Sequence, residues 1–360
     1  MARITLDGLR HSYMPEPQGE EDYALKRMDL EWKDGGAYAL LGPSGCGKST
    51  LLNIISGLLH PSEGRVLFND RDVTEEPPDR RNIAQVFQFP VIYDTMTVYD
   101  NLAFPLRNRG VPAIQVDARV TEIAEMLEMG DRLRTRAAGL GPDDKQKISM
   151  GRGLVRDDVN VIMFDEPLTV IDPAQKWKLR SKLKELHQKI AVTMIYVTHD
   201  QTEALTFADQ VVVMQEGQVV QIGTPVDLFE CPRHTFVGHF IGSPGMNILP
   251  CAVEGQRVAF QGVTVPTAGV PDVPSGAAAE IGVRPEFVSL STEGGIPAIV
   301  RKAADIGRHT VVEAMAGDVP VSAVLDGTAP EAGSEVRLRF DPTHTRVYAD
   351  GWLATRETGA

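Results

Sequence analysis

Residues 40–54 read Leu40-Leu41-Gly42-Pro43-Ser44-Gly45-Cys46-Gly47-Lys48-Ser49-Thr50-Leu51-Leu52-Asn53-Ile54. The stretch contains the pattern G-x-x-x-x-G-K-[ST]. The residues just before it, Ala37–Leu41, form a short apolar run that predicts a strand, and Thr50–Leu59 carry apolar residues at helical spacing. A glycine-rich turn between a strand and a helix is therefore the centre of the predicted fold.

This turn is suited to holding phosphate. Its glycines permit backbone conformations closed to other residues, so that several N–H groups point at one anion, and the N-terminus of the following helix adds a positive dipole. Lys48 is expected to reach the β- and γ-phosphates, and the Ser49 hydroxyl to ligate Mg²⁺. We predict a nucleoside triphosphate site rather than a turn without a ligand. Its predicted phosphate-binding residues are Gly42, Pro43, Ser44, Gly45, Cys46, Gly47, Lys48, Ser49 and Thr50.

The composition is that of a soluble globular protein. Of 360 residues, 42% are hydrophobic and 24% charged, and no apolar run approaches the ~20 residues that span a bilayer. No secretory leader opens the sequence, and the three scattered cysteines show neither metal spacing nor a disulfide framework, so we expect a reduced, cytosolic compartment. The net charge of −13 disfavours a nucleic-acid partner, which would require a basic face.

Strands alternate with helices through the first two thirds of the chain, which predicts a mostly parallel sheet covered on its faces, with a helical subdomain. The expected strands cover residues 4–6, 28–32, 37–41, 64–69, 83–90, 159–164 and 193–197, and the expected helices residues 50–59, 97–109, 116–129, 145–156 and 177–190. The fold class is thus an α/β phosphate-loop (P-loop) domain.

The pattern changes between Pro232 and Pro250, where helical periodicity disappears. Short β-type runs separated by Gly, Pro and Asp turns follow at residues 258–261, 280–283, 298–301, 311–314, 319–324, 336–340 and 346–348. This spacing predicts a small all-β barrel resembling an OB fold. We place the boundary near residue 240, which predicts domains at 1–240 and 241–360.

Polar residues follow several of the predicted strands, at the end of a parallel sheet where ligands bind. Asp165 suits a role at the Mg²⁺, outside its direct ligands, and Glu166 suits polarising a water that attacks the γ-phosphate. His199 lies just past a predicted strand and Gln88 at the end of one, and both are weaker signals. Gln88 could ligate a metal or cap a turn. Tyr13, which we expect at the end of the first strand, could stack on adenine or be an ordinary half-buried aromatic.

The order of these pieces resembles the ATP-binding subunits of ABC transporters, and within them the carbohydrate-importer group with a C-terminal regulatory barrel domain. The stretches that carry the resemblance are the phosphate loop, Val86-Phe87-Gln88, Thr97–Phe104, Phe164-Asp165-Glu166-Pro167, Val197-Thr198-His199-Asp200 and Gly282-Val283-Arg284-Pro285-Glu286. They extend over nearly the whole chain.

The resemblance implies ATP as the nucleotide and Mg²⁺ as its ion. It implies that Tyr13 stacks on adenine, that Lys48, Ser49 and Thr50 hold the phosphates and Mg²⁺, and that Gln88 lines the metal and the attacking water. The metal residues would then be Ser49, Gln88 and Asp165. For catalysis it implies Lys48, Glu166 as general base, and His199 as a γ-phosphate contact.

The resemblance also implies partners. Residues after Gln88 would face two transmembrane permease subunits at the cytoplasmic face of the inner membrane, a substrate-binding protein would act indirectly, and Asp172 would lie in the loop that crosses to a second ATPase subunit. The peripheral protein would hydrolyse ATP to drive import of a sugar or polyol.

One family motif departs from the pattern. The signature L-S-G-G-Q corresponds here to Leu140-Gly141-Pro142-Asp143-Asp144. The serine hydroxyl is lost, Pro142 removes an N–H group, and two aspartates would face the γ-phosphate across the dimer. Leu168-Thr169-Val170-Ile171-Asp172 likewise stands where S-N-L-D is usual.

These changes favour a heterodimer with a non-identical ATPase subunit whose intact signature covers this chain's nucleotide. The alternative is a homodimer that tolerates the change. By analogy with polyol importers that have two unlike ATPase genes, glycerol is the preferred cargo. Two other functions stay open: a soluble ABC-type ATPase acting on ribosomes or DNA, and a mainly regulatory subunit that holds ATP with little hydrolysis.

Overall fold

A computed structural model describes residues 2–356. Contacts divide the chain into two compact units, Met1–Pro225 and Val226–Ala360. Because the boundary prediction placed α8 (Pro225–Glu230) and α9 (Thr235–Phe240) in the first domain, it differs from this division. The assignment of the domains as 1–240 and 241–360 stays a prediction.

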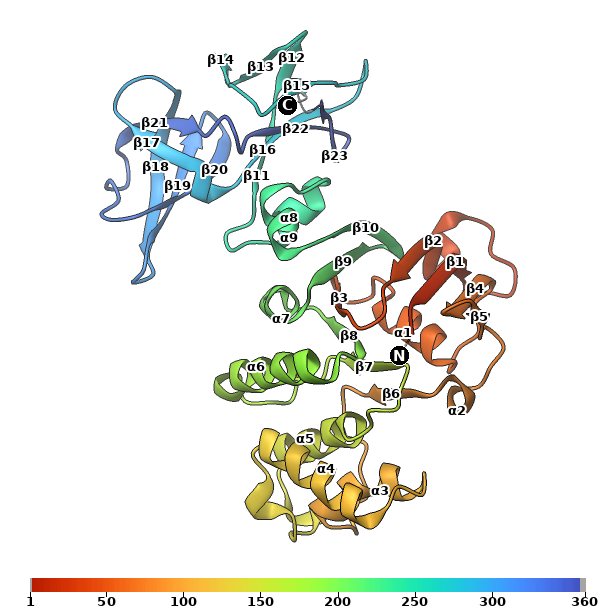
Figure 1. The fold of residues 1–360 in the computed structure, drawn as a ribbon. Helices are drawn as coiled ribbons and strands as arrows, with labels where there is room; N and C mark the ends of the chain where they lie inside the picture. Colours follow the sequence, from red (N-terminus) through yellow and green to blue (C-terminus); the bar gives the residue numbers. More distant parts are fainter. Residues whose placement is uncertain (1, 357–360) are drawn as a thin grey trace. The chain divides into compact units, whose positions relative to one another are not determined.

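A six-stranded sheet forms the centre of the first unit, in the order β10-β9-β3-β8-β7-β6 (Figure 1). Strands β9, β3, β8, β7 and β6 are parallel, and only the edge strand β10 runs antiparallel to its neighbour. The bounds are β3 Ala37–Leu41, β6 Ile83–Val86, β7 Val161–Asp165, β8 Thr193–Thr198, β9 Gln210–Gln215 and β10 Gln218–Gly223. The prediction of a mostly parallel sheet is thereby confirmed.

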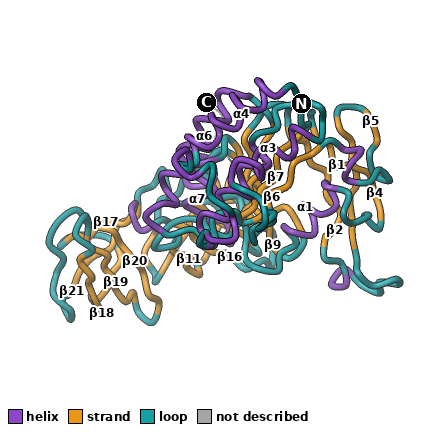
Figure 2. The backbone as a smooth tube through the Cα atoms, turned by 90° about the horizontal axis from the view of Figure 1, so that it is seen from below, coloured by secondary structure: helices purple, strands orange, loops and turns teal. Residues whose placement is uncertain are grey.

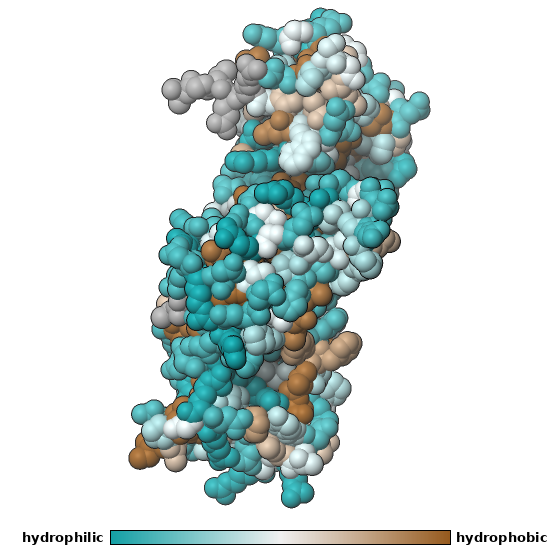
Figure 3. All heavy atoms as spheres, turned by 90° about the vertical axis from the view of Figure 1, so that its right-hand side faces the viewer, coloured by the Kyte–Doolittle hydropathy of each residue, from teal (hydrophilic) through white to brown (hydrophobic). Residues whose placement is uncertain are grey.

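A second, antiparallel sheet in the order β2-β1-β4-β5 packs over the helix α1 (Lys48–Ser56). One buried cluster joins Ile4 and Leu6 of this sheet to Leu51 and Ile55 of α1 and to Val197 of the six-stranded sheet, so α1 lies between the two sheets. The strands are β1 Ile4–His11, β2 Leu25–Trp32, β4 Glu63–Phe68 and β5 Arg71–Asp72. Hydrophilic residues predominate on the face of the molecule that carries this sheet (Figure 3).

Helices cover the other face of the six-stranded sheet. The rings of Phe164 (β7), Tyr196 (β8) and Phe207 (α7) pack side by side there, with centroids 5.9 and 5.1 Å apart. Figure 2 shows α1 and α7 on opposite sides of β6, β7 and β9. A helical subdomain of α3, α4 and α5 packs together, as Figure 1 also shows. The bounds are α2 Pro78–Arg81, α3 Val98–Arg107, α4 Ala113–Met126, α5 Pro142–Leu154, α6 Pro173–Ile190 and α7 Gln201–Phe207.

The second unit is built on antiparallel strand pairs around one buried cluster. Its largest sheet has the order β17-β21-β18-β19-β20, and a second has the order β11-β16-β22-β23. The bounds are β11 Asn247–Pro250, β12 Ala252–Glu254, β13 Arg257–Phe260, β14 Val263–Thr264, β15 Val270–Pro271, β16 Ala279–Val283, β17 Val288–Ser291, β18 Ile296–Asp305, β19 Thr310–Ala316, β20 Val319–Leu325, β21 Glu335–Phe340, β22 Arg346–Ala349, β23 Trp352–Leu353 and β24 Thr355–Arg356. Six of the seven predicted β-type runs lie wholly in strands, and the run 258–261 extends one residue beyond β13.

Arg284 explains why α8 and α9 belong to this second unit. Its guanidinium is buried and donates to the carbonyl oxygens of Leu228 and Phe229 in α8 and of Gly238 and Ile241 at α9. Burial lowers the pKa of Arg284 to about 10, and carbonyl dipoles at the helix ends, which favour a cation, surround the charge. One side chain just after β16 therefore holds both helices, although its acceptors lie 43 to 56 residues earlier in the chain.

Three local predictions are wrong. Strand β6 ends at Val86, so the strand expected over residues 83–90 is shorter than predicted and Gln88 lies beyond its end. Strand β1 ends at His11, so Tyr13 lies in the loop beyond the strand rather than at its end. Helix α9 lies between Pro232 and Pro250, where we expected no helix; its Phe236 and Phe240 stack on each other, and it is only six residues long, too short for a periodic signal.

Among the described residues, we find no helix whose length and apolar character would let it cross a membrane.

Candidate active site

The phosphate loop joins β3 to α1 through two positions where only glycine fits. A Cβ on Gly42 would lie 2.3 Å from the carbonyl oxygen of Met214 in β9, so the loop can leave β3 only because this side chain is absent. Gly47 has a φ of +102°, and a Cβ there would meet Leu25 and the carbonyl of Ala24. Left-handed backbone at this point turns the chain into α1, whose first residue is Lys48.

Lys48 is buried inside its own loop, where its Nζ donates to the carbonyl oxygens of Gly42 (2.8 Å) and Pro43 (2.9 Å). The Cys46 thiol lies 3.8 Å from the same nitrogen, and burial raises the pKa of this thiol. The ammonium group is thus kept at the centre of the loop by neutral acceptors. A phosphate oxygen, which is a stronger acceptor, would replace these carbonyls readily.

Ser49 and Asp165 meet across the sheet edge. The Ser49 hydroxyl lies 3.4 Å from Oδ1 of Asp165, which ends β7. Burial and then the neighbouring Glu166 raise the pKa of Asp165 above its ordinary value of 3.8. Hydroxyl and carboxylate oxygens are ligands that Mg²⁺ prefers, so these two side chains fit a site for that ion.

Glu166 lies in a strained turn just after β7. Its φ is +44°, a conformation that non-glycine residues rarely adopt and that costs about 1–3 kcal/mol. Two backbone bonds hold the turn: the N–H of Glu166 donates to the carbonyl of Val197 (2.9 Å), and the N–H of Thr169 donates to the carbonyl of Glu166 (3.2 Å). The surrounding structure therefore fixes where this carboxylate points.

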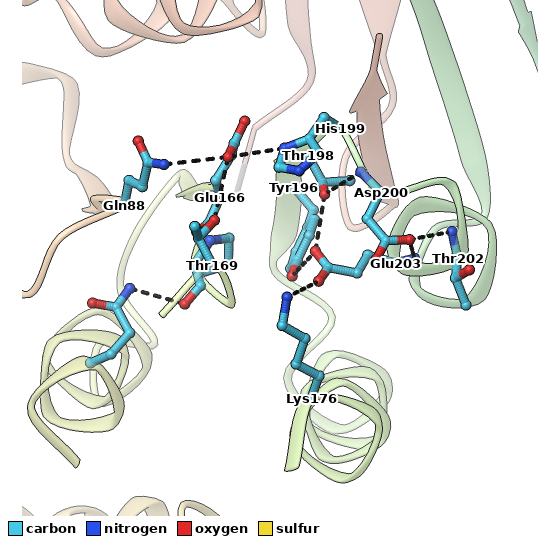
Figure 4. Close-up of polar contacts among 12 residues, drawn as sticks. Gln88, Glu166, Thr169, Lys176, Tyr196, Thr198, His199, Asp200, Thr202 and Glu203 are labelled. Carbon is cyan, nitrogen blue, oxygen red and sulfur yellow. Dashed lines mark hydrogen bonds and ion pairs between the residues drawn. The ribbon is translucent and has the colours of Figure 1, made fainter. Parts of the chain in front are cut away.

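Three side chains from different elements converge on Oε2 of Glu166 (Figure 4). Nδ1 of His199 lies 3.1 Å away, the Thr169 hydroxyl 3.3 Å and Nε2 of Gln88 3.4 Å. The structure thus brings Gln88, Glu166 and His199 together, although they are far apart in the sequence. A carboxylate held by three donors next to the phosphate loop can accept a proton from a water.

A fourth side chain, which the sequence did not single out, supports this cluster. Gln146 of α5 is fully buried, and its Nε2 donates to the carbonyls of Phe87 and Pro167 at 3.0 Å each. It thereby ties the residue before Gln88 to the residue after Glu166. In the sequence, the only sign of this role is a polar residue within the amphipathic pattern of α5. That pattern does not show which backbone groups the side chain contacts.

Tyr13 lies beside the first turn of α1. Its side chain is 65% exposed, its hydroxyl is 3.1 Å from that of Thr50, and the His11 ring packs edge-on against it. An exposed ring held at one end by a hydrogen bond can receive a planar base on its free face. The geometry fits the stacking role, which stays a prediction.

The altered signature forms the first turn of α5. Pro142 is the first helical residue, where a missing N–H is tolerated, and the aspartates after it suit the positive end of the helix. Asp143 accepts a hydrogen bond from the N–H of Asp172 (3.2 Å), and Asp144 pairs with Arg132. We expected both aspartates to be directed at a nucleotide; instead each has a partner within the chain.

Asp165 should make the nucleotide-free protein sensitive to pH. An acid whose pKa is raised by folding binds its proton more tightly in the folded state, so its contribution to stability is lost as the pH rises through that raised pKa. Asp165→Asn, which cannot ionise, is expected to raise the melting temperature by about 2 °C at pH 8 and by less at pH 4. Calorimetry at both values tests this; an equal shift at both, or a lower melting temperature at pH 8, contradicts it.

Comparison with known proteins decides the family. The models named ABC transporter, MalK OB fold domain and TOBE domain match residues 25–169, 242–288 and 281–347. The sn-glycerol-3-phosphate import ATP-binding protein UgpC of Escherichia coli (strain K12) is 38% identical over 99% of this chain and 100% of its own. The chain belongs to the ATP-binding subunits of ABC transporters. Members of this family hydrolyse ATP, and the OB-like second domain predicted from the sequence is confirmed.

Other relatives and solved structures agree. UgpC of Rhodopseudomonas palustris (strain BisB5) is 43% identical over 82% of this chain and 77% of its own. The sulfoquinovosyl glycerol transport ATP-binding protein SmoE of Agrobacterium fabrum is 37% identical over 90% and 92%. The structure of cbiO1 from Clostridium perfringens, part of the ABC transporter complex cbiONQ, superposes with a TM-score of 0.56 at 28% identity, covering 63% of this chain and 90% of that one.

Proposed function

We propose that this ABC ATPase hydrolyses ATP at its own phosphate loop to drive import of a sugar or polyol. The observation that carries this is the convergence of Gln88, His199 and Thr169 on the Glu166 carboxylate, beside a complete phosphate loop. A passive nucleotide-holding subunit would have no need of an oriented general base.

The chemistry follows from the positions of these groups. Lys48 would exchange its carbonyl partners for the β- and γ-phosphates, while Ser49 and Gln88 would hold Mg²⁺ with Asp165 beside them. The ion would neutralise developing charge on the phosphate oxygens. Glu166 would take a proton from the attacking water, and His199, held at Nδ1 by that carboxylate, would contact the γ-phosphate with its other ring nitrogen.

The segment after Gln88 is suited to dock on permease subunits. Phe89, Val91 and Tyr93 expose 68%, 53% and 40% of their surface, which gives one short loop three exposed apolar side chains. Arg152 covers the Tyr93 ring at 4.6 Å and donates to the carbonyl of Val91, which gives the loop a defined shape. Docking there would place the protein at the cytoplasmic face of the membrane, with a substrate-binding protein acting through the permeases.

Glycerol derivatives are the cargo that the relatives favour. UgpC is named for sn-glycerol-3-phosphate and SmoE for sulfoquinovosyl glycerol, and glycerol itself was our preference from the sequence. Deleting the gene and measuring uptake of labelled glycerol, sn-glycerol-3-phosphate and sulfoquinovosyl glycerol separates the three. Loss of one uptake activity identifies the cargo, whereas unchanged uptake of all three contradicts this part of the proposal.

The names of the relatives lend no support to a second, unlike ATPase subunit. What supports a heterodimer is the first turn of α5, where Pro142, Asp143 and Asp144 replace residues that would otherwise offer N–H groups to a nucleotide across the dimer. Asp143 and Asp144 are paired within the chain, but the turn that they form with Pro142 lacks a serine hydroxyl and one N–H group that could be offered to a γ-phosphate. Two copies of this chain would therefore cover each other's ATP poorly.

Restoring the signature tests the assembly. A variant with a restored signature is expected to raise ATP turnover of the purified chain alone by about tenfold or more. It carries Gly141→Ser, Pro142→Gly, Asp143→Gly and Asp144→Gln. These changes put a hydroxyl and N–H donors where carboxylate acceptors and a proline now stand. A control carrying Asp117→Asn and Asp131→Asn removes two exposed charges from the same helical subdomain and should leave turnover unchanged. Brisk turnover by the unaltered chain alone would show that it works as a homodimer.

A further inference from the structure

A buried carboxylate lies next to the residue that precedes His199. Glu203 of α7 is 4% exposed, and its Oε2 accepts hydrogen bonds from the hydroxyls of Tyr196 (3.1 Å) and Thr198 (3.0 Å). Its other oxygen, Oε1, lies 3.5 Å from Nζ of Lys176 in α6. Figure 4 shows this cluster next to the Glu166 group. These four residues are distinct from those proposed above to hold the nucleotide and Mg²⁺.

The carboxylate sets the direction of the hydrogen bonds around His199. An ionised carboxylate can only accept, so both hydroxyls must donate to Glu203. The Thr198 oxygen is then free to accept from the N–H of Asp200 at 3.0 Å. Asp200 in turn accepts from the N–H groups of Thr202 and Glu203, which starts α7. The residues on both sides of His199 are therefore held by one chain of bonds that ends on Glu203.

His199 itself needs this support. Its side chain is 54% exposed, so packing does not fix it, and its Nδ1 contacts Oε2 of Glu166 at 3.1 Å. The place of the imidazole is set mainly by its backbone. A shift of about 1 Å at a catalytic group can cost up to 10²-fold in rate.

We propose that Glu203, paired with Lys176, is a positioning residue that holds His199 in contact with Glu166 during ATP hydrolysis. The inference rests on the function proposed above for His199. Lys176 follows one turn after Asp172, the N-cap of α6, and it compensates the buried charge of Glu203. The pair thus joins the start of α6 to the turn that carries His199.

Glu203→Gln tests the proposal with a side chain of the same shape. If the amide oxygen takes the place of Oε2, the NH₂ group faces the ammonium of Lys176, donor against donor; if the amide is flipped, its NH₂ faces two hydroxyl groups that need an acceptor. In the complete transporter we expect kcat for ATP to fall about tenfold, with the KM for ATP changed less than twofold. Glu185→Gln, an exposed acid on α6, is the matched control and should leave both unchanged.

Turnover should be expressed per ATP-binding site, and the sites are counted by titration with a fluorescent ATP analogue. A variant that is partly unfolded then has fewer counted sites, and its rate per site is not lowered by the unfolded fraction. Removing the donor conflict in the double variant Glu203→Gln with Lys176→Met should recover most of the lost kcat. A Glu203→Gln protein with normal kcat per site, or a double variant no better than the single one, overturns the proposal.

A last comparison separates this inference from the function on which it rests. In a His199→Ala background, Glu203→Gln should change the residual rate less than twofold, because it acts through the missing imidazole. A further tenfold loss there shows that Glu203 acts by another route and refutes the inference alone. If His199→Ala keeps the wild-type rate, the role proposed for His199 fails instead.

Discussion

Glu166→Gln is expected to lower ATP turnover of the complete transporter by about 10²- to 10³-fold while ATP still binds. The amide keeps the shape of the side chain and can still accept from His199 or Thr169 through its oxygen, but it cannot take a proton from water. The site should therefore bind ATP without hydrolysing it. Turnover is measured as released phosphate, and binding with a fluorescent ATP analogue.

Glu185→Gln again serves as the control for this change, since it removes an exposed carboxylate outside the site. Import should fail together with hydrolysis if this chain supplies the energy. Should import continue in the Glu166→Gln strain, the chain would be the mainly regulatory, ATP-holding subunit that the altered signature left open. A turnover within twofold of wild type would remove Glu166 from the mechanism.

Lys48→Met is expected to weaken ATP binding by about 10- to 100-fold and to abolish import. The change keeps the length of the side chain but removes an ammonium group whose hydrogen bonds to phosphate are each stabilising by about 1.5–3 kcal/mol. Since Lys48 is buried against carbonyls of its own loop, and the methionine has no donors for them, the nucleotide-free protein should also lose some stability.

The control for this prediction is Lys33→Met, an exposed lysine just before the loop's strand. Equilibrium titration with ATP and Mg²⁺ measures both variants, and circular dichroism checks that each is folded. Wild-type affinity in the Lys48→Met protein would mean that the nucleotide is held by groups other than this phosphate loop.

Much of the first unit could be predicted from the sequence, because its signals are local and periodic. The run Ala37–Leu41, buried at every position, became β3, and the glycines after it occupy positions where a side chain would clash or a positive φ is needed. The polar residues after β6, β7 and β8 meet at one edge because parallel strands bring their carboxyl ends together. The order of β6, β7 and β8 in the sheet places these residues near one another, and the strained turn at Glu166 sets where its carboxylate points.

What could not be predicted depends on contacts between distant segments. Arg284 is one charged residue in a β-rich stretch, and nothing local indicates that it caps α8 and α9. Gln146 and Glu203 are polar residues in helices. From the sequence alone they look the same as polar residues on a solvent-exposed helix face, although both side chains are buried. The partners of Asp143 and Asp144 were missed for the same reason. Their charges alone predict repulsion of a bound γ-phosphate, whereas in the structure the N–H of Asp172 donates to Asp143 and Arg132 pairs with Asp144.

The structure of the Glu166→Gln protein with ATP and Mg²⁺ bound would test the proposed site most directly. The account predicts that Nζ of Lys48 leaves the carbonyls of Gly42 and Pro43 for the β- and γ-phosphates, that Mg²⁺ contacts Ser49 and Gln88, and that the adenine lies on Tyr13. A γ-phosphate out of reach of both Lys48 and His199 would contradict it.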